Sequence, residues 1–233
     1  MPPPTYILVH GAWHGAWCWR DLTPELDQRA ATWRTIDLPS SHDFGAGTNA
    51  LESDADVVAR LANLAGPVVL VGHSYGGAVI SEAASRVNKL VSLVYIAALR
   101  PHVGQSASEA SRVVQVRTAL DEAMKVEGAF VRLDVEQAVA GLYLECSSEV
   151  QDWALPQLTS QTLASFRGRR QTQDAKVPSR FLLCRNDRAL DPSLQERMAA
   201  GCDEVVELSS DHSPYLSHPA PCAELILSAV KRG

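Results

Sequence analysis

Residues 68–78 read Val-Val-Leu-Val-Gly-His-Ser-Tyr-Gly-Gly-Ala. The first four residues form an apolar, mostly β-branched run, which predicts a buried β-strand. Three small residues follow from Gly76 and are typical of a closely packed helix. Because glycines flank Ser74 on both sides, the backbone can turn sharply from the strand into the helix. The stretch therefore predicts a strand, a tight turn at Ser74 and a helix that runs to about Arg86.

Apolar strand-like runs alternate with helix-like patterns on both sides of this stretch. Such alternation is typical of a mostly parallel sheet that is covered by helices on both faces. We therefore expect an α/β fold with a doubly wound, mostly parallel sheet in one domain, residues 1–233. The expected strands are 6–10, 32–38, 68–71, 90–98, 181–184 and 205–208, and the expected helices are 17–29, 51–64, 76–86 and 223–230.

The alternation stops between residues 101 and 178, a segment that we call the cap. Its pattern is that of helices only, at about 108–124, 135–143 and 148–158. Because the cap lies between two strands of the same sheet, we expect it to stand over the sheet edge as an inserted helical layer. It is not predicted to be an independent domain.

The composition is that of an ordinary globular protein, with 46% hydrophobic and 21% charged residues among 233. The formal net charge is -6, and no basic stripe offsets it, so nucleic acid is not an expected partner. The apolar runs are shorter than the ~20 residues of a membrane span, so no membrane association is expected.

Five cysteines are scattered without metal-ligand spacing, which predicts reduced, mostly buried thiols and no metal site. The first residues, Met-Pro-Pro-Pro, lack the features of a secretory signal. A cytoplasmic location is therefore expected. The oligomeric state is not predicted by any pattern in the sequence.

The Gly-Xaa-Ser-Xaa-Gly motif around Ser74 lies between an apolar strand and a small-residue helix, the setting of a nucleophile elbow. There the Ser74 Oγ would stand free above the sheet, and the amides of the first helix turn would face developing negative charge. The alternative is an ordinary glycine-rich turn. The motif predicts that Ser74 is the nucleophile of an acyl-transfer reaction.

The loop at residues 10–17, His-Gly-Ala-Trp-His-Gly-Ala-Trp, follows the first strand. A loop at that place supplies one oxyanion donor, and the residue after the nucleophile supplies the other. The expected donors are the backbone N–H groups of Ala12 and Tyr75. The predicted substrate-binding residues are Gly11, Trp13 and His73, although packing of the first helix is the favoured role for Trp13.

After such an elbow the catalytic acid and then the histidine follow in chain order, at the ends of later strands. Asp187 comes directly after the strand at 181–184 and is the predicted acid. Asp191 is the alternative, but it precedes Pro192 and is also a typical helix N-cap. His212 follows the last strand and is the predicted base, whereas His218 lies further on, before a proline.

These residues together resemble the α/β-hydrolase superfamily, in particular the branch of plant methylesterases, hydroxynitrile lyases and their bacterial esterase relatives. The likeness runs nearly end to end. It is carried by residues 8–15, Asp37-Leu38-Pro39, residues 71–77, Leu183-Cys184 with Asp187 and Gln195, and Asp211-His212, and in the cap by residues 142–146, Trp153-Ala154 and Gln161.

The resemblance implies a Ser74–His212–Asp187 triad and a small, largely apolar pocket roofed by helices. Lyases of this branch carry threonine after the first strand's histidine and lysine after the catalytic histidine, where this chain has Gly11 and Ser213. We therefore expect a serine esterase that cleaves small carboxylic esters through an acyl-enzyme, with no cofactor. The alternatives are a lactonase or amide hydrolase, a hydroxynitrile-lyase-type enzyme, and a non-enzymatic small-ligand receptor.

Overall fold

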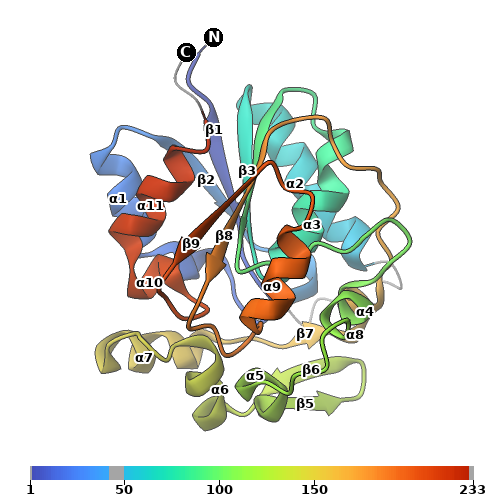
Figure 1. Ribbon diagram of the computed structural model, residues 1–233, viewed down its shortest axis with the longest axis vertical. Coiled ribbons are helices and arrows are strands. Elements are labelled where there is room, and N and C mark those ends of the chain that lie inside the picture. Colours follow the sequence, from blue (N-terminus) through green and yellow to red (C-terminus); the bar gives the residue numbers. More distant parts are fainter. Residues whose placement is uncertain (1, 42–49, 231–233) are drawn as a thin grey trace.

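A six-stranded, wholly parallel sheet forms the centre of the protein (Figure 1). The computed structural model describes residues 2–41 and 50–230. In spatial order the strands are β2 (Thr32–Ile36), β1 (Thr5–Val9), β3 (Val68–His73), β4 (Leu90–Ile96), β8 (Ser179–Cys184) and β9 (Glu204–Leu208). The expected fold class is confirmed, and each strand lies within two residues of its predicted bounds.

Helices cover both faces of this sheet. Figure 1 shows α1 (Leu22–Gln28) and α11 (Pro219–Leu227) on one side, and α2 (Ala50–Ala65), α3 (Tyr75–Ala83) and α9 (Pro192–Ala199) on the other. The strand order runs outward in both directions from β1 and β3, and ligand sites of open α/β sheets form at such a reversal point. Because β1 and β3 are hydrogen-bonded neighbours, the loop after β1 lies beside the turn at Ser74.

Short helices complete the connections around the sheet. They are η1 (Ala16–Trp19), η2 (Pro39–Ser41), η3 (Ala84–Arg86), η4 (Leu155–Gln157) and α10 (Pro214–Ser217). The prediction of one continuous helix at 17–29 was wrong, because this segment forms two separate helices, η1 and α1. Pro24 lacks a backbone N–H and is tolerated only in a first turn, so a new helix begins at Leu22.

The cap connects β4 to β8 and lies at one end of the sheet, opposite the chain termini (Figure 1). Its elements are α4 (Ala107–Ser111), α5 (Ala119–Ala123), β5 (Met124–Glu127), β6 (Phe130–Leu133), α6 (Val135–Leu142), α7 (Ser148–Ala154), β7 (Gln161–Thr162) and α8 (Leu163–Arg167). The prediction of helices only was wrong, because β5, β6 and β7 form an antiparallel sheet.

The predicted helix at 108–124 was wrong for a related reason. The chain leaves α4 after Ser111, and Met124 already belongs to β5. The β5–β6 hairpin turns at Gly128, which has a φ of 60°. A glycine between two short extended runs is a hairpin signal, but the run before Gly128, Met-Lys-Val-Glu, holds only one β-branched residue, so the signal in the sequence is weak.

Two further expectations concern burial and the membrane. All five cysteines are free thiols, and four of them are buried, as predicted. Within residues 2–41 and 50–230, no helix is both long and apolar enough to cross a membrane.

Candidate active site

Ser74 lies at the turn between β3 and α3 with a backbone φ of 52°, a conformation that is costly for a residue with a side chain. The structure around the turn holds this strained backbone in place. The Ser74 N–H donates to the Ile96 carbonyl at 3.1 Å, and the Ser74 carbonyl accepts from Leu99 at 3.0 Å. At Gly72 a Cβ would lie only 2.6 Å from the Gly76 carbonyl oxygen, so the predicted close packing of the elbow is present.

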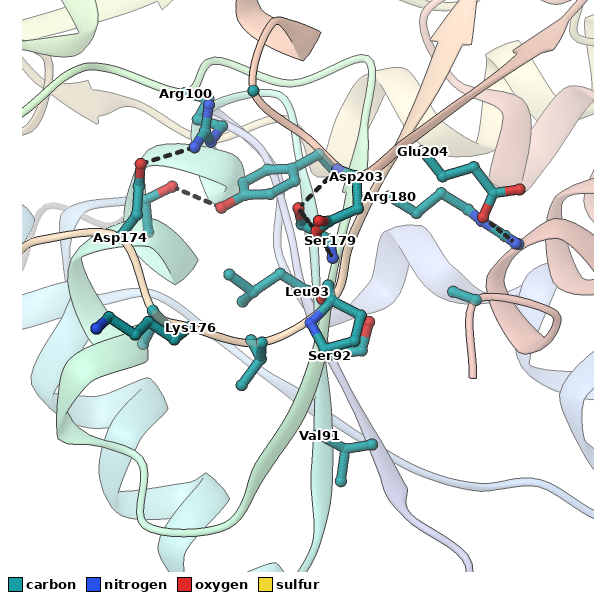
Figure 2. A pocket seen from close by; sticks show the side chains of 18 of the residues that line it. Val91, Ser92, Leu93, Arg100, Asp174, Lys176, Ser179, Arg180, Asp203 and Glu204 are labelled. Carbon is teal, nitrogen blue, oxygen red and sulfur yellow. Dashed lines mark hydrogen bonds and ion pairs between the residues drawn. The ribbon is translucent and has the colours of Figure 1, made fainter. Parts of the chain in front are cut away.

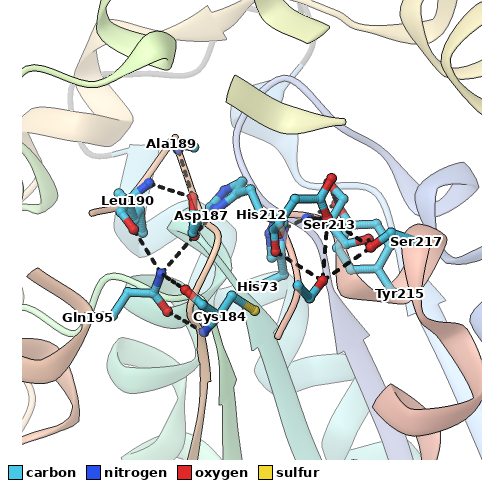
Figure 3. A network of polar contacts seen from close by, with 12 residues as sticks. His73, Cys184, Asp187, Ala189, Leu190, Gln195, His212, Ser213, Tyr215 and Ser217 are labelled. Atoms are coloured by element: carbon cyan, nitrogen blue, oxygen red, sulfur yellow. Dashed lines mark hydrogen bonds and ion pairs between the residues drawn. The ribbon is translucent and has the colours of Figure 1, made fainter. Parts of the chain in front are cut away.

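Asp187 and His212, which follow β8 and β9, are hydrogen-bonded to each other (Figure 3). The His212 Nδ1 lies 2.7 Å from the Asp187 Oδ2, and both side chains are buried. The Asp187 Oδ1 also accepts from the Ala189 and Leu190 amides, at 2.7 and 2.9 Å. These bonds fix the carboxylate in one orientation toward the imidazole.

The two alternative residues have other partners. Asp191 caps α9, where its Oδ1 accepts from the Ser193 amide at 2.9 Å. His218 is half-exposed, and its Nδ1 lies 3.8 Å from the Glu145 Oε2. Neither is hydrogen-bonded to Asp187 or His212.

Gln195 on α9 supports the acid, and this contact was not predicted. Its Nε2 donates to the Asp187 Oδ2 and to the Leu190 carbonyl, both at 2.8 Å, and its Oε1 accepts from the Cys184 amide at 2.9 Å. Figure 3 shows this amide between the end of β8 and the Asp187 carboxylate. The signal in the sequence was a glutamine beside Leu194 on the apolar face of a helix, because buried amides need partners.

His73 contacts the loop that carries His212 and does not line the pocket described below. Its Nε2–H donates to the His212 carbonyl at 2.9 Å, and its Nδ1 lies 3.5 Å from the Tyr215 hydroxyl. Burial holds the pKa of His73 well below 6.5, so the ring is neutral. His73 therefore contacts the backbone of His212 and helps to hold the loop in which His212 lies.

The loop after β1 is held by two of its own histidines. The Nδ1 atoms of His10 and His14 contact the carbonyls of Gly11 and Ala12, both at 2.8 Å. Burial lowers the pKa of His14 to about 3, so this neutral ring donates from Nδ1, and its Nε2 accepts from the Tyr143 hydroxyl at 2.7 Å. The contact between His14 and the cap was not predicted.

The predicted oxyanion donors lie beside Ser74. Ala12, Tyr75 and Ser74 line the same pocket. Tyr75 is the first residue of α3, so its N–H has no intrahelical acceptor. Among the described residues, neither this N–H nor that of Ala12 has a hydrogen-bond acceptor. Two unused donors therefore adjoin the serine.

This pocket has a volume of about 580 Å³, and the cap forms much of its wall. Trp13 lines it, but Gly11 and His73 do not. The Trp13 indole N–H donates to the Val131 carbonyl at 2.9 Å, so this side chain both lines the pocket and contacts the cap. Apolar residues of the wall include Leu120, Val131, Leu163, Phe166, Leu190 and Leu194.

A larger hollow, of about 1090 Å³, lies elsewhere on the protein (Figure 2). Most of its strand residues come from the first halves of β4 and β8, and it shares no lining residue with the pocket at Ser74. Its charged groups are mostly paired, as in Arg100 with Asp174 at 2.9 Å and Arg180 with Glu204 at 2.7 Å. The candidate active site is therefore the smaller pocket, at the carboxyl ends of the strands.

The free energy of unfolding is expected to decrease when the pH is lowered from about 7.5 to about 5.5. His14 and His73 stay neutral in the folded protein, whereas both take up protons below pH 6.5 once unfolded, and that uptake favours unfolding. At a pH one unit below 6.5 the effect is about 1.4 kcal/mol for His14. Urea unfolding at the two pH values measures the difference.

Asp54 acts in the opposite direction, because burial raises its pKa to about 6 and protonation below that value favours the folded state. Burial also raises the pKa of Asp211, which acts in the same direction as Asp54. The two buried histidines still outweigh these carboxyl groups, so the net change remains a loss. His14→Gln should reduce the loss. Equal or greater stability at the lower pH would contradict neutral, buried rings.

Comparison with known proteins identifies the family. A family model described as an α/β hydrolase family matches residues 6–225. The chain belongs to the α/β hydrolase family. The predicted family is thereby confirmed, and relatives named as esterases confirm its esterase branch and the expectation of a hydrolase.

Several relatives of this α/β hydrolase match over nearly the whole chain. An α/β hydrolase of Aspergillus novofumigatus, nvfD, is 29% identical and covers 99% of this chain and 98% of its own. Methyl jasmonate esterase 1 of Vitis vinifera is 28% identical, with 94% of each chain covered. The crystal structure of a pyrethroid hydrolase from Sphingobium faniae has a TM-score of 0.84 at 23% identity, over 97% and 96% of the chains, and shows the shared fold.

Proposed function

We propose that this α/β hydrolase cleaves small carboxylic esters, with Ser74 as nucleophile, His212 as general base and Asp187 as the residue that orients His212. The observation that carries the proposal is the buried hydrogen bond of 2.7 Å between His212 and Asp187. This bond joins the residues that follow β8 and β9. Ser74 follows β3 of the same sheet. The relatives named as esterases support the reaction class.

In the first half-reaction, the Ser74 Oγ attacks the ester carbonyl carbon while the His212 Nε2 accepts its proton. The negative charge that develops on the carbonyl oxygen is stabilised by the N–H groups of Ala12 and Tyr75, each of which typically contributes about 10²–10³ in rate. The tetrahedral intermediate then releases the alcohol, which takes the proton from His212. An acyl group remains on Ser74.

In the second half-reaction, His212 removes a proton from water, and the resulting hydroxide attacks the acyl carbonyl. The carboxylic acid leaves, and the proton returns to Ser74. The Asp187 carboxylate stabilises the imidazolium in both steps. No metal or organic cofactor takes part. We also propose that the enzyme acts in the cytoplasm.

The residues at the two positions that distinguish lyases support hydrolysis. A Cβ added at Gly11 would lie 2.9 Å from the His73 Nδ1 and 3.0 Å from the Ser74 Cβ, so a threonine would need these groups to shift. Ser213 is buried and uncharged, and its Oγ lies 3.3 Å from the Tyr215 hydroxyl. A lysine at that position would place a cation beside His212 to stabilise a leaving cyanide ion, and a serine cannot.

Short p-nitrophenyl and methyl esters are expected to be hydrolysed, whereas mandelonitrile cleavage should be negligible. Emulsified long-chain lipid should also react poorly, because the pocket holds about 580 Å³. The measurement is kcat/KM for each substrate on one preparation, with Ser74→Ala as blank. Mandelonitrile cleavage that rivals ester hydrolysis would assign the protein to the lyases. Activity on lactones or amides alone would change the substrate class, and no reaction at all would favour a receptor.

A further inference from the structure

One buried polar network runs from Trp13, the residue after the proposed donor Ala12, to the side chain of the second proposed donor, Tyr75. Between them lie Gln161 of the cap, Ser40 of η2 and Asp54 of α2, each fully buried. Segments far apart in the chain therefore meet behind the pocket.

Gln161 uses every hydrogen-bonding site of its amide. Its Oε1 accepts from the Trp13 backbone N–H at 3.3 Å and from the Ser41 hydroxyl at 2.9 Å. Its Nε2 donates to the hydroxyl oxygens of Ser40, at 2.8 Å, and of Ser165, at 2.6 Å. The amide is thus fixed in one orientation and cannot rotate without losing a bond to a buried group.

The second half of the network reaches the elbow through a buried carboxylate. Ser40 donates to Asp54 through its hydroxyl, at 2.5 Å, and through its backbone N–H, at 3.0 Å. The Tyr75 hydroxyl donates to the Asp54 Oδ2 at 2.8 Å. Hydrogen bonds to an ionised group are among the stronger ones, so this carboxylate fixes Tyr75 relative to Ser40.

The Trp13 backbone needs such support. Its φ of 64° is costly for a bulky residue, and such a conformation persists only where its surroundings enforce it. The cap supplies the enforcement: besides Gln161, the Thr159 amide donates to the Trp13 carbonyl at 2.9 Å. The Ala12–Trp13 peptide, which follows the Ala12 donor directly, is therefore oriented by contacts from the cap.

We propose that Gln161 is a positioning residue that sets the geometry of both oxyanion donors at once, through Trp13 on one side and through Ser40, Asp54 and Tyr75 on the other. This inference depends on the proposed ester hydrolysis. Its consequence is that the cap contributes to transition-state stabilisation as well as enclosing the substrate. Loss of Gln161 should then weaken binding of the oxyanion far more than binding of the ester.

The test compares Gln161→Leu with Gln151→Leu, a matched control. The Gln151 Nε2 also makes two cap hydrogen bonds, to the Tyr143 and Cys146 carbonyls at 2.9 Å, but none to the network. The probe is a trifluoromethyl ketone, whose adduct with a serine carries an oxyanion. For Gln161→Leu we expect kcat and ketone affinity both to fall by about 10²-fold while KM changes by less than about threefold. Gln151→Leu should leave the ratio of ketone affinity to KM unchanged.

Gln161→Glu provides a variant of nearly the same shape in case Gln161→Leu does not fold. In its ionised form the glutamate keeps an acceptor for Trp13 but cannot donate to Ser40, so ketone affinity should again fall. A double-mutant cycle with Tyr75→Phe measures the coupling between Gln161 and the Tyr75 end of the network. Additive losses, or a rate loss with unchanged ketone affinity, would overturn the proposal. A wild-type protein that hydrolyses no ester would instead refute the proposed function.

Discussion

Ser74→Ala protein is expected to lose ester hydrolysis by about 10⁵–10⁶ in kcat, because no other group can form the acyl intermediate. The change removes one small oxygen atom and leaves the backbone of the elbow in place, so folding should be retained. A fluorophosphonate reagent provides a direct measurement. Wild-type protein should gain one adduct, which peptide mass spectrometry should locate at Ser74, and the variant should gain none.

Ser213→Ala is the matched control for this experiment. Ser213 is also a buried serine, adjacent to His212, but its hydroxyl has a partner in Tyr215 and it does not line the pocket. The control should label as the wild type does. Full labelling of the Ser74→Ala protein would move the nucleophile to another residue.

Asp187→Asn is expected to lower kcat by about 10⁴-fold with little loss of folded protein. The asparagine amide group would face a site where the carboxylate now accepts hydrogen bonds from His212, Gln195 and two backbone amides. The imidazole would then be held in the wrong tautomer, with its Nε2 unable to accept the proton of Ser74. Steady-state kinetics and a urea unfolding curve on the same preparation measure both effects.

Asp191→Asn serves as the comparison, because Asp191 lies four residues away and caps α9. It should lose at most about 2 kcal/mol of stability and keep most of its activity. If Asp191→Asn lost activity and Asp187→Asn did not, the role of the acid would pass to Asp191.

The elbow could be predicted because its signal is local. A strand, a turn and a helix lie consecutively in residues 68–78. The glycines of this stretch indicate that the backbone packs closely at the turn, and the structure has this close packing. Asp187 and His212 were predictable because the carboxyl ends of parallel strands meet at one edge of the sheet. Their mutual hydrogen bond follows from strand order, with β8 and β9 adjacent.

The polar groups behind the site could not be predicted in the same way. β7 has two residues, too few to produce a pattern, and the partners of Gln161 at Ser41 and Trp13 lie 120 and 148 positions away. Such contacts depend on how the cap packs against the sheet, which hydrophobic periodicity does not encode. The β5–β6 hairpin is different, because Gly128 marks its turn in the sequence, although the residues on both sides of it also fit a helical pattern.

The hydrogen bonds between the cap and Trp13 bear on how such an enzyme can acquire new specificities. If residues 101–178 were exchanged for the cap of a relative, the walls of the pocket would change, but so would the groups that Trp13 contacts at Val131, Thr159 and Gln161. A change of cap would therefore alter both the substrate specificity and the conformation of the loop after β1. A productive graft would have to keep those three contacts while varying the apolar positions between them.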